Sequence, residues 1–178
     1  MRRTALLGLP AVLLLAACST TVAGQASPAA PTAPSAPTAP SSAGPSDADR
    51  AAVADLFDGL SRSSRSGLAE HAEYMAEHNH PEFTYTADEC LSAFRGAGLE
   101  DGYTVDYVAD TDSMVPDDGW TLGADLGRYA GLEPSGEVYV LPVDVTQTFR
   151  GTTDGYSADL HAAILDGTAY FFFSCDGA

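Results

Sequence analysis

Apolar residues recur at helical spacing between residues 47 and 94. The first set lies three and four positions apart and consists of Val53, Leu56, Phe57 and Leu60. This spacing places an apolar stripe on one side of a helix, which we expect over residues 47–65. Ser46 and Asp49 resemble a capping box with Asp in place of Glu at its start, and Gly67 breaks the helix.

Two further helices are expected after this one. The apolar positions of the second, over residues 68–79, are Leu68, Ala72, Met75 and Ala76. Pro81 stops it, because the residue before a proline is driven away from the helical conformation. Thr86 and Glu89 form a capping box for the third helix, which ends near Gly96. One face of the third helix, directed toward the core, carries Ala87, Cys90, Leu91 and Phe94.

Alternating apolar and polar residues dominate the second half of the chain. We expect strands over residues 103–108, 120–122, 137–150, 156–165 and 168–175, and a short one over residues 82–85. Asp166-Gly167, between the last two runs, is the strongest short-range signal of a two-residue hairpin. Together these elements predict an α+β fold in which N-terminal helices pack on an antiparallel sheet.

The hairpin determines which side chains share a face. A two-residue turn pairs Leu165 with Thr168, and counting outward pairs Ala163 with Tyr170. The face predicted to lie in the core then carries Ala158, Leu160, Ala162, Ile164, Phe171, Phe173 and Cys175. This face directs Cys175 toward the helices, where Cys90 also points.

The first 18 residues have the pattern of an export signal and not that of a folded domain. Arg2 and Arg3 precede an apolar run over residues 5–15, which is too short to span a bilayer and is typical of a cleaved export signal. The following Leu15-Ala16-Ala17-Cys18 resembles the lipobox of bacterial lipoproteins. That resemblance implies cleavage before Cys18, attachment of a diacylglycerol to its thiol, and a protein anchored at the extracytoplasmic face of the cell membrane.

A spacer is expected after the lipidated cysteine. Residues 19–46 are almost entirely Ala, Ser, Thr, Pro and Gly, and prolines recur every third position from Pro28 to Pro40, which is the period of polyproline II. We expect a disordered or semi-rigid segment, with a docking site for a proline-binding partner or an O-glycosylated stalk as alternatives. The predicted organisation is a signal peptide over residues 1–17, Cys18 with its spacer over residues 18–46, and one domain over residues 47–178.

The net charge of the chain limits the classes of molecule that the domain can bind. The chain has 25 acidic residues and eight arginines, and loss of Arg2 and Arg3 with the signal leaves a net charge of −19. Nucleic acid and anionic lipid headgroups are therefore poor partners for the domain, and the lipid anchor supplies the contact with the membrane.

Lipidation of Cys18 leaves Cys90 and Cys175 as a pair in an oxidising compartment, and we predict a disulfide between them.

The order of these elements resembles the cone-shaped domains of the nuclear transport factor 2-like superfamily, with cystatin-like folds as near neighbours. The resemblance covers residues 47–175 and implies a curved sheet that wraps the helices and leaves a pocket at the open end of the cone. Chemistry like that of ketosteroid isomerase requires an Asp base and a Tyr or protonated Asp donor to converge in the pocket. The strand residues available for this are Tyr103, Asp106, Tyr107, Tyr139 and Asp144.

The hairpin face opposite the predicted core carries a candidate binding site. Its members are Asp159, His161, Tyr170 and Phe172, with Ala163 between them. We favour a half-exposed sheet face or a dimer contact, in which Tyr170 and Phe172 form a patch for a partner. The alternative is an acid/base pair, because Asp159 and His161 are two apart on one side of a strand.

Two polar clusters raise the question of metal binding. The first supplies imidazoles from His71, His78 and His80, and the second supplies loop carboxylates from Asp110, Asp112, Asp117 and Asp118. His71 and His78 lie about 10 Å apart along a helix, which is too far to bind one ion. The order of the carboxylates departs from that of an EF-hand. We predict a solvated acidic helix face and a polar turn, with no metal and no cofactor.

The sequence contains no motif typical of serine hydrolases, P-loop enzymes or zinc proteases. We predict a noncatalytic, membrane-anchored domain that binds a small ligand or an envelope protein. A ketosteroid isomerase-like enzyme and a structural or assembly protein of the envelope are the alternatives.

Overall fold

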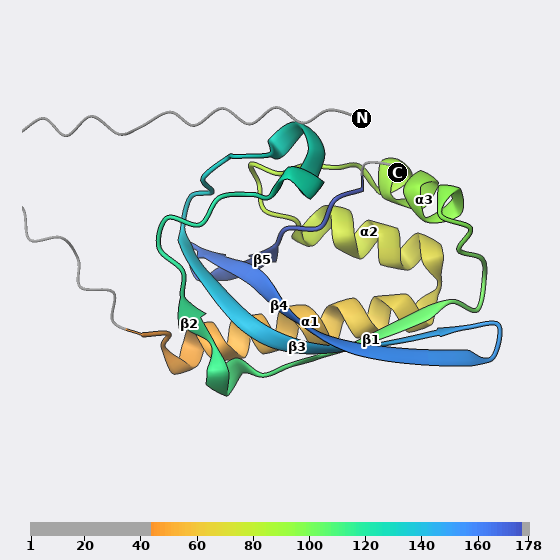
Figure 1. Cartoon of the computed structure of the whole chain (residues 1–178), viewed down its shortest axis with the longest axis horizontal. Helices are drawn as coiled ribbons and strands as arrows, with labels where there is room; N and C mark the ends of the chain where they lie inside the picture. The colour runs from red at the N-terminus through yellow and green to blue at the C-terminus, as the bar shows by residue number, and fades with distance from the viewer. Residues whose placement is uncertain (1–43, 176–178) are drawn as a thin grey trace, which may run out of the picture. The chain divides into compact units, whose positions relative to one another are not determined.

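The computed structural model describes residues 44–175, so the predicted signal, Cys18 and most of the spacer lie outside the described residues. Three helices pack against a curled antiparallel sheet that forms a half-barrel (Figure 1), which confirms the predicted α+β class. The helices are α1 (Asp47–Ser66), α2 (Leu68–His78) and α3 (Ala87–Gly96). The strands are β1 (Thr104–Ala109), β2 (Val115–Pro116), β3 (Glu137–Phe149), β4 (Thr152–Leu165) and β5 (Thr168–Phe171). Two 3-10 helices lie between β1 and β3, η1 (Thr111–Ser113) and η2 (Ala124–Tyr129).

Side-chain caps determine where α1 and α3 begin. The Ser46 hydroxyl accepts a hydrogen bond from the Asp49 N–H at 3.1 Å, and the Asp49 carboxylate accepts from the Ser46 N–H at 2.9 Å. Thr86 and Glu89 make the same reciprocal pair at α3. Gly67 separates α1 from α2 with a φ of 135°, where an L side chain would be strained. The predicted helix boundaries are confirmed to within a residue.

The sheet has the order β1-β3-β4-β5, and β2 pairs with β3 beyond the end of β1. The predicted hairpin register is confirmed, since Leu165 pairs with Thr168 and Ala163 pairs with Tyr170. Both turn residues have positive φ, 52° at Asp166 and 79° at Gly167, as a primed hairpin turn requires.

The last strand is shorter than predicted. We expected pairing as far as Cys175, but β5 ends at Phe171. The cause is Asn79 at the end of α2, whose side-chain amide exchanges two hydrogen bonds with the backbone of Phe173, each 3.0 Å long. The His80 N–H also donates to the Phe171 carbonyl at 3.0 Å. These contacts draw the chain away from β4.

Three other strand predictions need correction. Residues 82–85 and 120–122 are irregular. The carbonyl of Thr84 accepts from the Tyr129 hydroxyl at 2.9 Å instead of joining a ladder. β4 begins at Thr152, four residues earlier than predicted, because the hairpin turn at Arg150-Gly151 joins it directly to β3.

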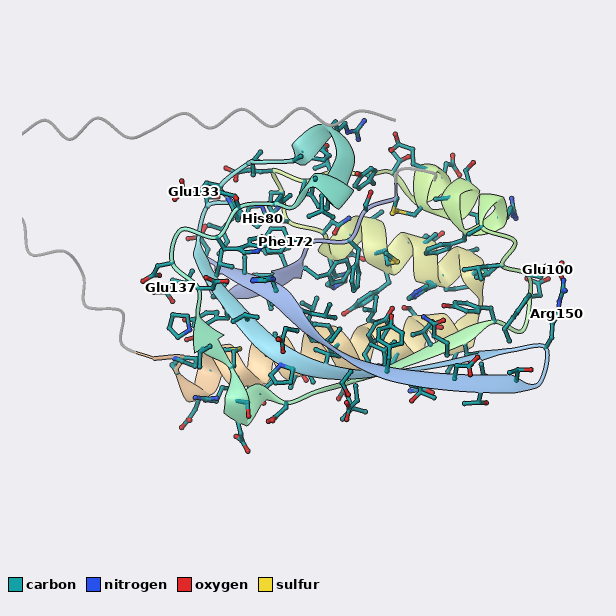
Figure 2. All side chains as sticks on the ribbon, in the orientation of Figure 1. His80, Glu100, Glu133, Glu137, Arg150 and Phe172 are labelled. Atoms are coloured by element: carbon teal, nitrogen blue, oxygen red, sulfur yellow. A yellow bond between two sulfur atoms is a disulfide. The ribbon has the colours of Figure 1, made fainter. Side chains whose placement is uncertain are left out.

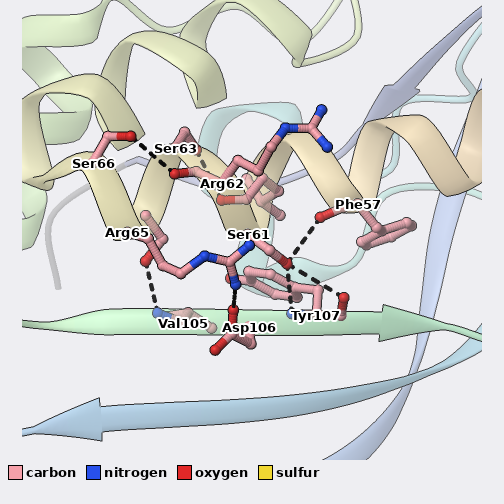
Figure 3. A network of polar contacts seen from close by, with 11 residues as sticks. Phe57, Ser61, Arg62, Ser63, Arg65, Ser66, Val105, Asp106 and Tyr107 are labelled. Atoms are coloured by element: carbon pink, nitrogen blue, oxygen red, sulfur yellow. Dashed lines mark hydrogen bonds and ion pairs between the residues drawn. The ribbon is translucent and has the colours of Figure 1, made fainter.

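Helix α1 covers the edge of the sheet that β1 forms (Figure 3). The Ser64 hydroxyl accepts from the Val105 N–H at 2.6 Å, and the Ser61 hydroxyl accepts from the Tyr107 N–H at 2.8 Å. Both serines are buried. The helix thus satisfies edge N–H groups that would otherwise lack partners away from water.

The predicted disulfide between Cys90 and Cys175 is present, with the two Cα atoms 4.6 Å apart (Figure 2). It joins α3 to the segment after β5, and Cys90 is fully buried. The predicted core face of the hairpin is observed in part. Ala162, Ile164, Phe171 and Cys175 are buried, whereas Ala158, Leu160 and Phe173 are half-buried.

Candidate functional site

A pocket of about 410 Å³ opens beside β4, where β5 leaves the sheet. Its aromatic lining consists of Phe57, Trp120, His161, Phe172 and Phe173, and its polar lining includes Thr121, Asp159 and Ser174. Neighbouring strand residues point to opposite faces, so Leu160 and His161 bring both faces of β4 to the pocket. Another hollow, of about 480 Å³, lies between α1 and α2, and the aromatic side chains in its lining are those of Tyr74 and His78. We therefore place the candidate site beside β4.

His161 is held between a carboxylate and an indole. Its Nε2 lies 2.8 Å from Asp117 Oδ2, and its ring stacks on Trp120 with centroids 4.1 Å apart and planes inclined by 16°. Asp117 comes from the loop after β2, not from β4 itself. In the alternative acid/base pair, Asp117 therefore takes the place of Asp159, and Asp159 instead lines the pocket.

The expected half-exposed patch for a partner is wrong at Phe172, whereas Tyr170 is half-buried as expected. Phe172 is 7% exposed, and its ring packs against the rings of His80 at 5.4 Å and Trp120 at 4.9 Å. Figure 2 shows His80 and Phe172 next to each other. Tyr170 is half-buried and meets the His80 ring edge-on at 5.9 Å. The irregular segments around His80 and Trp120 cross this face of the sheet, which strand alternation alone does not show.

His80 supports the wall of the pocket from behind. It is fully buried, its Nε2 lies 3.0 Å from the Ser135 carbonyl, and its Nδ1 lies 3.2 Å from the Glu82 N–H. A carbonyl needs a donor and an N–H needs an acceptor, so these contacts select the tautomer protonated at Nε2. Both ring nitrogens serve the fold, which leaves His80 a structural role beneath Phe172.

Trp120 also lines a second hollow, in which its neighbours are acidic. This hollow of about 260 Å³ is lined by Trp120 and by carboxylates from Asp117, Asp118 and Glu133. No arginine lines this hollow or the pocket beside β4. The region of Trp120 therefore favours neutral or positively charged groups over anions.

The histidines of α2 have separate partners. His71 is buried, with Nδ1 3.0 Å from the Ser63 hydroxyl, and burial lowers its pKa to about 4. His78 Nδ1 lies 3.0 Å from the Tyr74 carbonyl, and its ring stacks on the Tyr74 ring. The expected solvated face is therefore wrong for His71, as it is for Asn79 and His80, which are also buried.

The loop carboxylates are also divided among different tasks. Asp110 caps η1 by accepting from the Ser113 N–H and hydroxyl, and these bonds, the hydroxyl first, lower its pKa. Asp117 binds His161, while Asp118 faces the second hollow. Within residues 44–175, no group of three or more His, Cys, Asp or Glu residues is placed to hold a metal ion.

The residues considered for isomerase chemistry lie in different places. Asp106 forms an ion pair with Arg65, and Asp144 accepts from the Ser157 hydroxyl. Tyr107 follows Asp106 on β1 and so points to the opposite face of the sheet. The sheet therefore separates these carboxylates from the tyrosine.

Of the tyrosines on the concave face, Tyr139 is buried, and Tyr103 and Tyr107 are half-buried. Burial raises the pKa of Tyr107, which packs near Phe57, and also raises that of Tyr103. Tyr139 donates to the Glu137 carboxylate at 2.9 Å, and its pKa is raised first by burial and then by this bond. These phenols remain protonated and act as hydrogen-bond donors and core side chains.

No protein-family model matches the chain, and the searches of curated proteins and of solved structures find no match either. No helix within the described range is long and apolar enough to cross a membrane.

Proposed function

We propose that this protein is a lipoprotein of the cell envelope, anchored by a diacylglycerol on Cys18 at the extracytoplasmic face. Its domain binds a small ligand or an envelope protein in the pocket beside β4, without catalysis. The proposal is carried by one observation, the convergence of Trp120, His161 and Phe172 around a pocket of about 410 Å³.

The properties of the pocket are those of a binding site. Its volume falls within the range of about 300–1,000 Å³ that is typical of small-molecule sites, and such sites combine apolar walls with a few polar groups. Asp117 fixes the orientation of His161, and His161 supports the indole of Trp120. A wall held in this way loses little conformational entropy when a ligand binds. Asp159 supplies a negative charge at the pocket.

We also propose that the domain is a cone-shaped member of the nuclear transport factor 2-like superfamily. Three helices followed by a curled antiparallel sheet support this proposal. Two features depart from the expected pattern, because residues 82–85 form no strand and the candidate pocket lies at the edge of β4.

The pairing of His161 with Asp117 favours a second candidate, an enzyme that uses His161 as a general base. A carboxylate that orients an imidazole beside a pocket is a common acid/base arrangement. His161→Gln separates the two functions, since it would abolish turnover by an enzyme, whereas it would only weaken the binding of a ligand.

Fluorescence of Trp120, the only tryptophan of the chain, provides the test. We would titrate the full chain in detergent micelles with 4-phenylbutylamine, 4-phenylbutanol and 4-phenylbutyrate, which share one apolar body and differ in charge. We expect a saturable change in emission, strongest with the amine and weakest with the acid. Asp159→Arg should weaken binding of the amine, whereas Asp154→Arg, on the same strand but outside the pocket, should not. No saturable change with any probe would refute the proposal.

A further inference from the structure

Strand β4 extends far beyond its neighbour β5. β5 pairs with β4 only over Ala162–Leu165, whereas β3 pairs with it from Thr152 to Ile164. No other strand between residues 44 and 175 pairs with β4. The side of β4 away from β3 is therefore a free sheet edge from Thr152 to Asp159 (Figure 1).

The register identifies the backbone groups that face this edge. Antiparallel neighbours alternate between pairs that are hydrogen-bonded to each other and pairs that are not. Pro142, which has no N–H, pairs with Asp159, and its carbonyl accepts from the Asp110 N–H at 2.9 Å on the other side of β3. Asp159 therefore belongs to a non-bonded pair. Counting by twos, the N–H and C=O groups directed to the free edge are those of Thr153, Gly155, Ser157 and Asp159.

The free edge leads into the candidate pocket. Asp159, Leu160 and His161 line the pocket, and they directly precede the residues of β4 that β5 covers. The chain turns toward Asn79 at Phe173, directly after Phe172, the residue that would pair with His161 in a longer β5. A segment laid along the edge in line with β5 would therefore place a side chain from its end in the pocket.

The charges along the edge favour a basic partner. Asp144, Asp154 and Asp159 lie on the β3–β4 hairpin, and Asp117 lies at the pocket. Arg150 in the hairpin turn is paired with Glu100 at 2.6 Å, as Figure 2 shows. A second copy of the chain would bring the same carboxylates against each other, and like charges on adjacent strands are destabilising.

We propose that the free edge of β4 binds an extended, basic segment of a partner protein as an added strand, with one apolar side chain of that segment in the pocket. This inference rests on the proposed binding function of the pocket. Backbone hydrogen bonds hold such a segment, and pockets for alternate side chains select its sequence. Lysine or arginine side chains of the segment lie beside Asp159 and Asp144.

The probe is a synthetic nine-residue peptide that alternates lysine and valine and begins with phenylalanine. An antiparallel strand places this N-terminal end at the pocket. We would follow amide hydrogen exchange of the full chain in detergent micelles by NMR. The peptide should slow exchange roughly tenfold or more at Thr153, Gly155, Ser157 and Asp159. The amides of Asp154, Tyr156 and Ala158 already bond to β3 and should change little. A peptide with glutamate in place of lysine should bind at least tenfold more weakly.

A proline variant tests the role of the edge itself. Ser157→Pro removes an N–H that faces the edge and leaves the β3 ladder intact, because the Ser157 N–H does not bond to β3. It should weaken peptide binding tenfold or more, whereas Ser157→Ala, which keeps the N–H, should not. If Ser157→Pro alters the fold, a peptide N-methylated at its edge-facing amides tests the same contact with the protein unchanged.

The outcomes separate this inference from the proposed function. Peptide binding with uniform protection along β4, or with unchanged affinity for Ser157→Pro, would overturn the added strand. Binding of 4-phenylbutylamine without binding of the lysine peptide would refute the basic partner and leave the pocket function standing. Absence of binding by both probes would refute both proposals.

Discussion

At the scale of a single residue, Gly59 determines how α1 and α2 pack. The Tyr74 side chain of α2 crosses α1 there, and its hydroxyl donates to the Leu56 carbonyl at 2.9 Å. A Cβ atom on Gly59 would lie 2.5 Å from Tyr74 Cζ. Glycine in a helix interior costs about 1 kcal/mol relative to alanine. The close approach of Tyr74 gives a physical reason for a glycine at this position.

We expect Gly59→Ala to lower the free energy of unfolding by about 1–3 kcal/mol, as overpacking of a buried site does. In a Tyr74→Ala background the sign should reverse, because the overlap is gone and helix propensity favours alanine. Urea unfolding measures both effects. Gly96→Ala, where nothing lies within 4 Å of the added Cβ, is the control and should not destabilise. A loss of stability from Gly59→Ala that persists without Tyr74 would contradict this explanation.

His71 makes the stability of the folded domain depend on pH. The side chain is 3% exposed, and its ring lies between the Ser63 hydroxyl and the Phe94 ring. Burial disfavours the charged imidazolium and lowers the pKa of His71 from 6.5 to about 4. Neither neighbour carries a negative charge that would offset this effect. The unfolded chain therefore binds this proton near pH 6.5, whereas the folded chain binds it only near pH 4.

The contribution of His71 is complete above about pH 6.5 and decreases as pH falls toward 4, by about 3 kcal/mol. His71→Gln removes this dependence. We therefore expect the free energy of unfolding of the wild type, relative to that of the variant, to decrease by this amount between pH 7 and pH 4 in urea titrations. His78→Gln controls for the loss of an imidazole from the same helix. A difference that stays constant over this range would show that the ring does not become buried as the neutral form.

At the scale of elements, the serines of α1 hold the first strand. The Val105 N–H donates to Ser64 and the Tyr107 N–H donates to Ser61, so each serine lost leaves a buried donor without its acceptor. We expect Ser64→Ala and Ser61→Ala to lower the free energy of unfolding by about 1–3 kcal/mol each. Amide exchange at Val105 and Tyr107 should quicken in the matching variant.

Ser66→Ala provides the control for these variants. Its hydroxyl is exposed and donates to the Arg62 carbonyl within α1, so its loss should change stability by less than about 0.5 kcal/mol. Equal effects of Ser64→Ala and Ser66→Ala would show that the covering of the β1 edge contributes nothing.

Local signals predict most elements, and distant contacts explain the errors. Helix caps and the Asp166-Gly167 turn depend on neighbouring residues, so the sequence reveals them directly. The end of β5 depends on Asn79, 94 residues from its partner Phe173. No periodicity of the last strand contains that information.

The same limit applies to the candidate site. Alternation in the hairpin correctly placed Asp159 and His161 beside each other, and both line the pocket. The carboxylate that holds His161 comes from Asp117, 44 residues away, and the stacking indole comes from an irregular loop. A lone tryptophan next to an acidic turn was the available signal for this loop.

At the scale of the whole molecule, a covalent bond joins regions that are far apart in the sequence, and the net charge opposes the compact state. The disulfide links residues separated by 85 positions, which stabilises the fold by up to about 4.5 kcal/mol through the entropy of the unfolded chain. It holds α3 to the segment that forms part of the pocket wall, since Ser174 precedes Cys175. The excess of carboxylates acts in the opposite direction, because like charges repel in the compact state.

The proposed anchor concerns the location of the entire protein. An acidic domain is repelled by anionic headgroups, and the described helices do not include one that crosses a bilayer. Two acyl chains bind a membrane stably, whereas a single chain binds only marginally. We therefore expect wild-type protein in cells to fractionate with membranes and to incorporate labelled fatty acid, and Cys18→Ser to be released or mislocalised without label. Thr20→Ala, two residues further along, should behave as the wild type. Retention of Cys18→Ser in the membrane fraction would refute the lipid anchor and leave the pocket beside β4 unaffected.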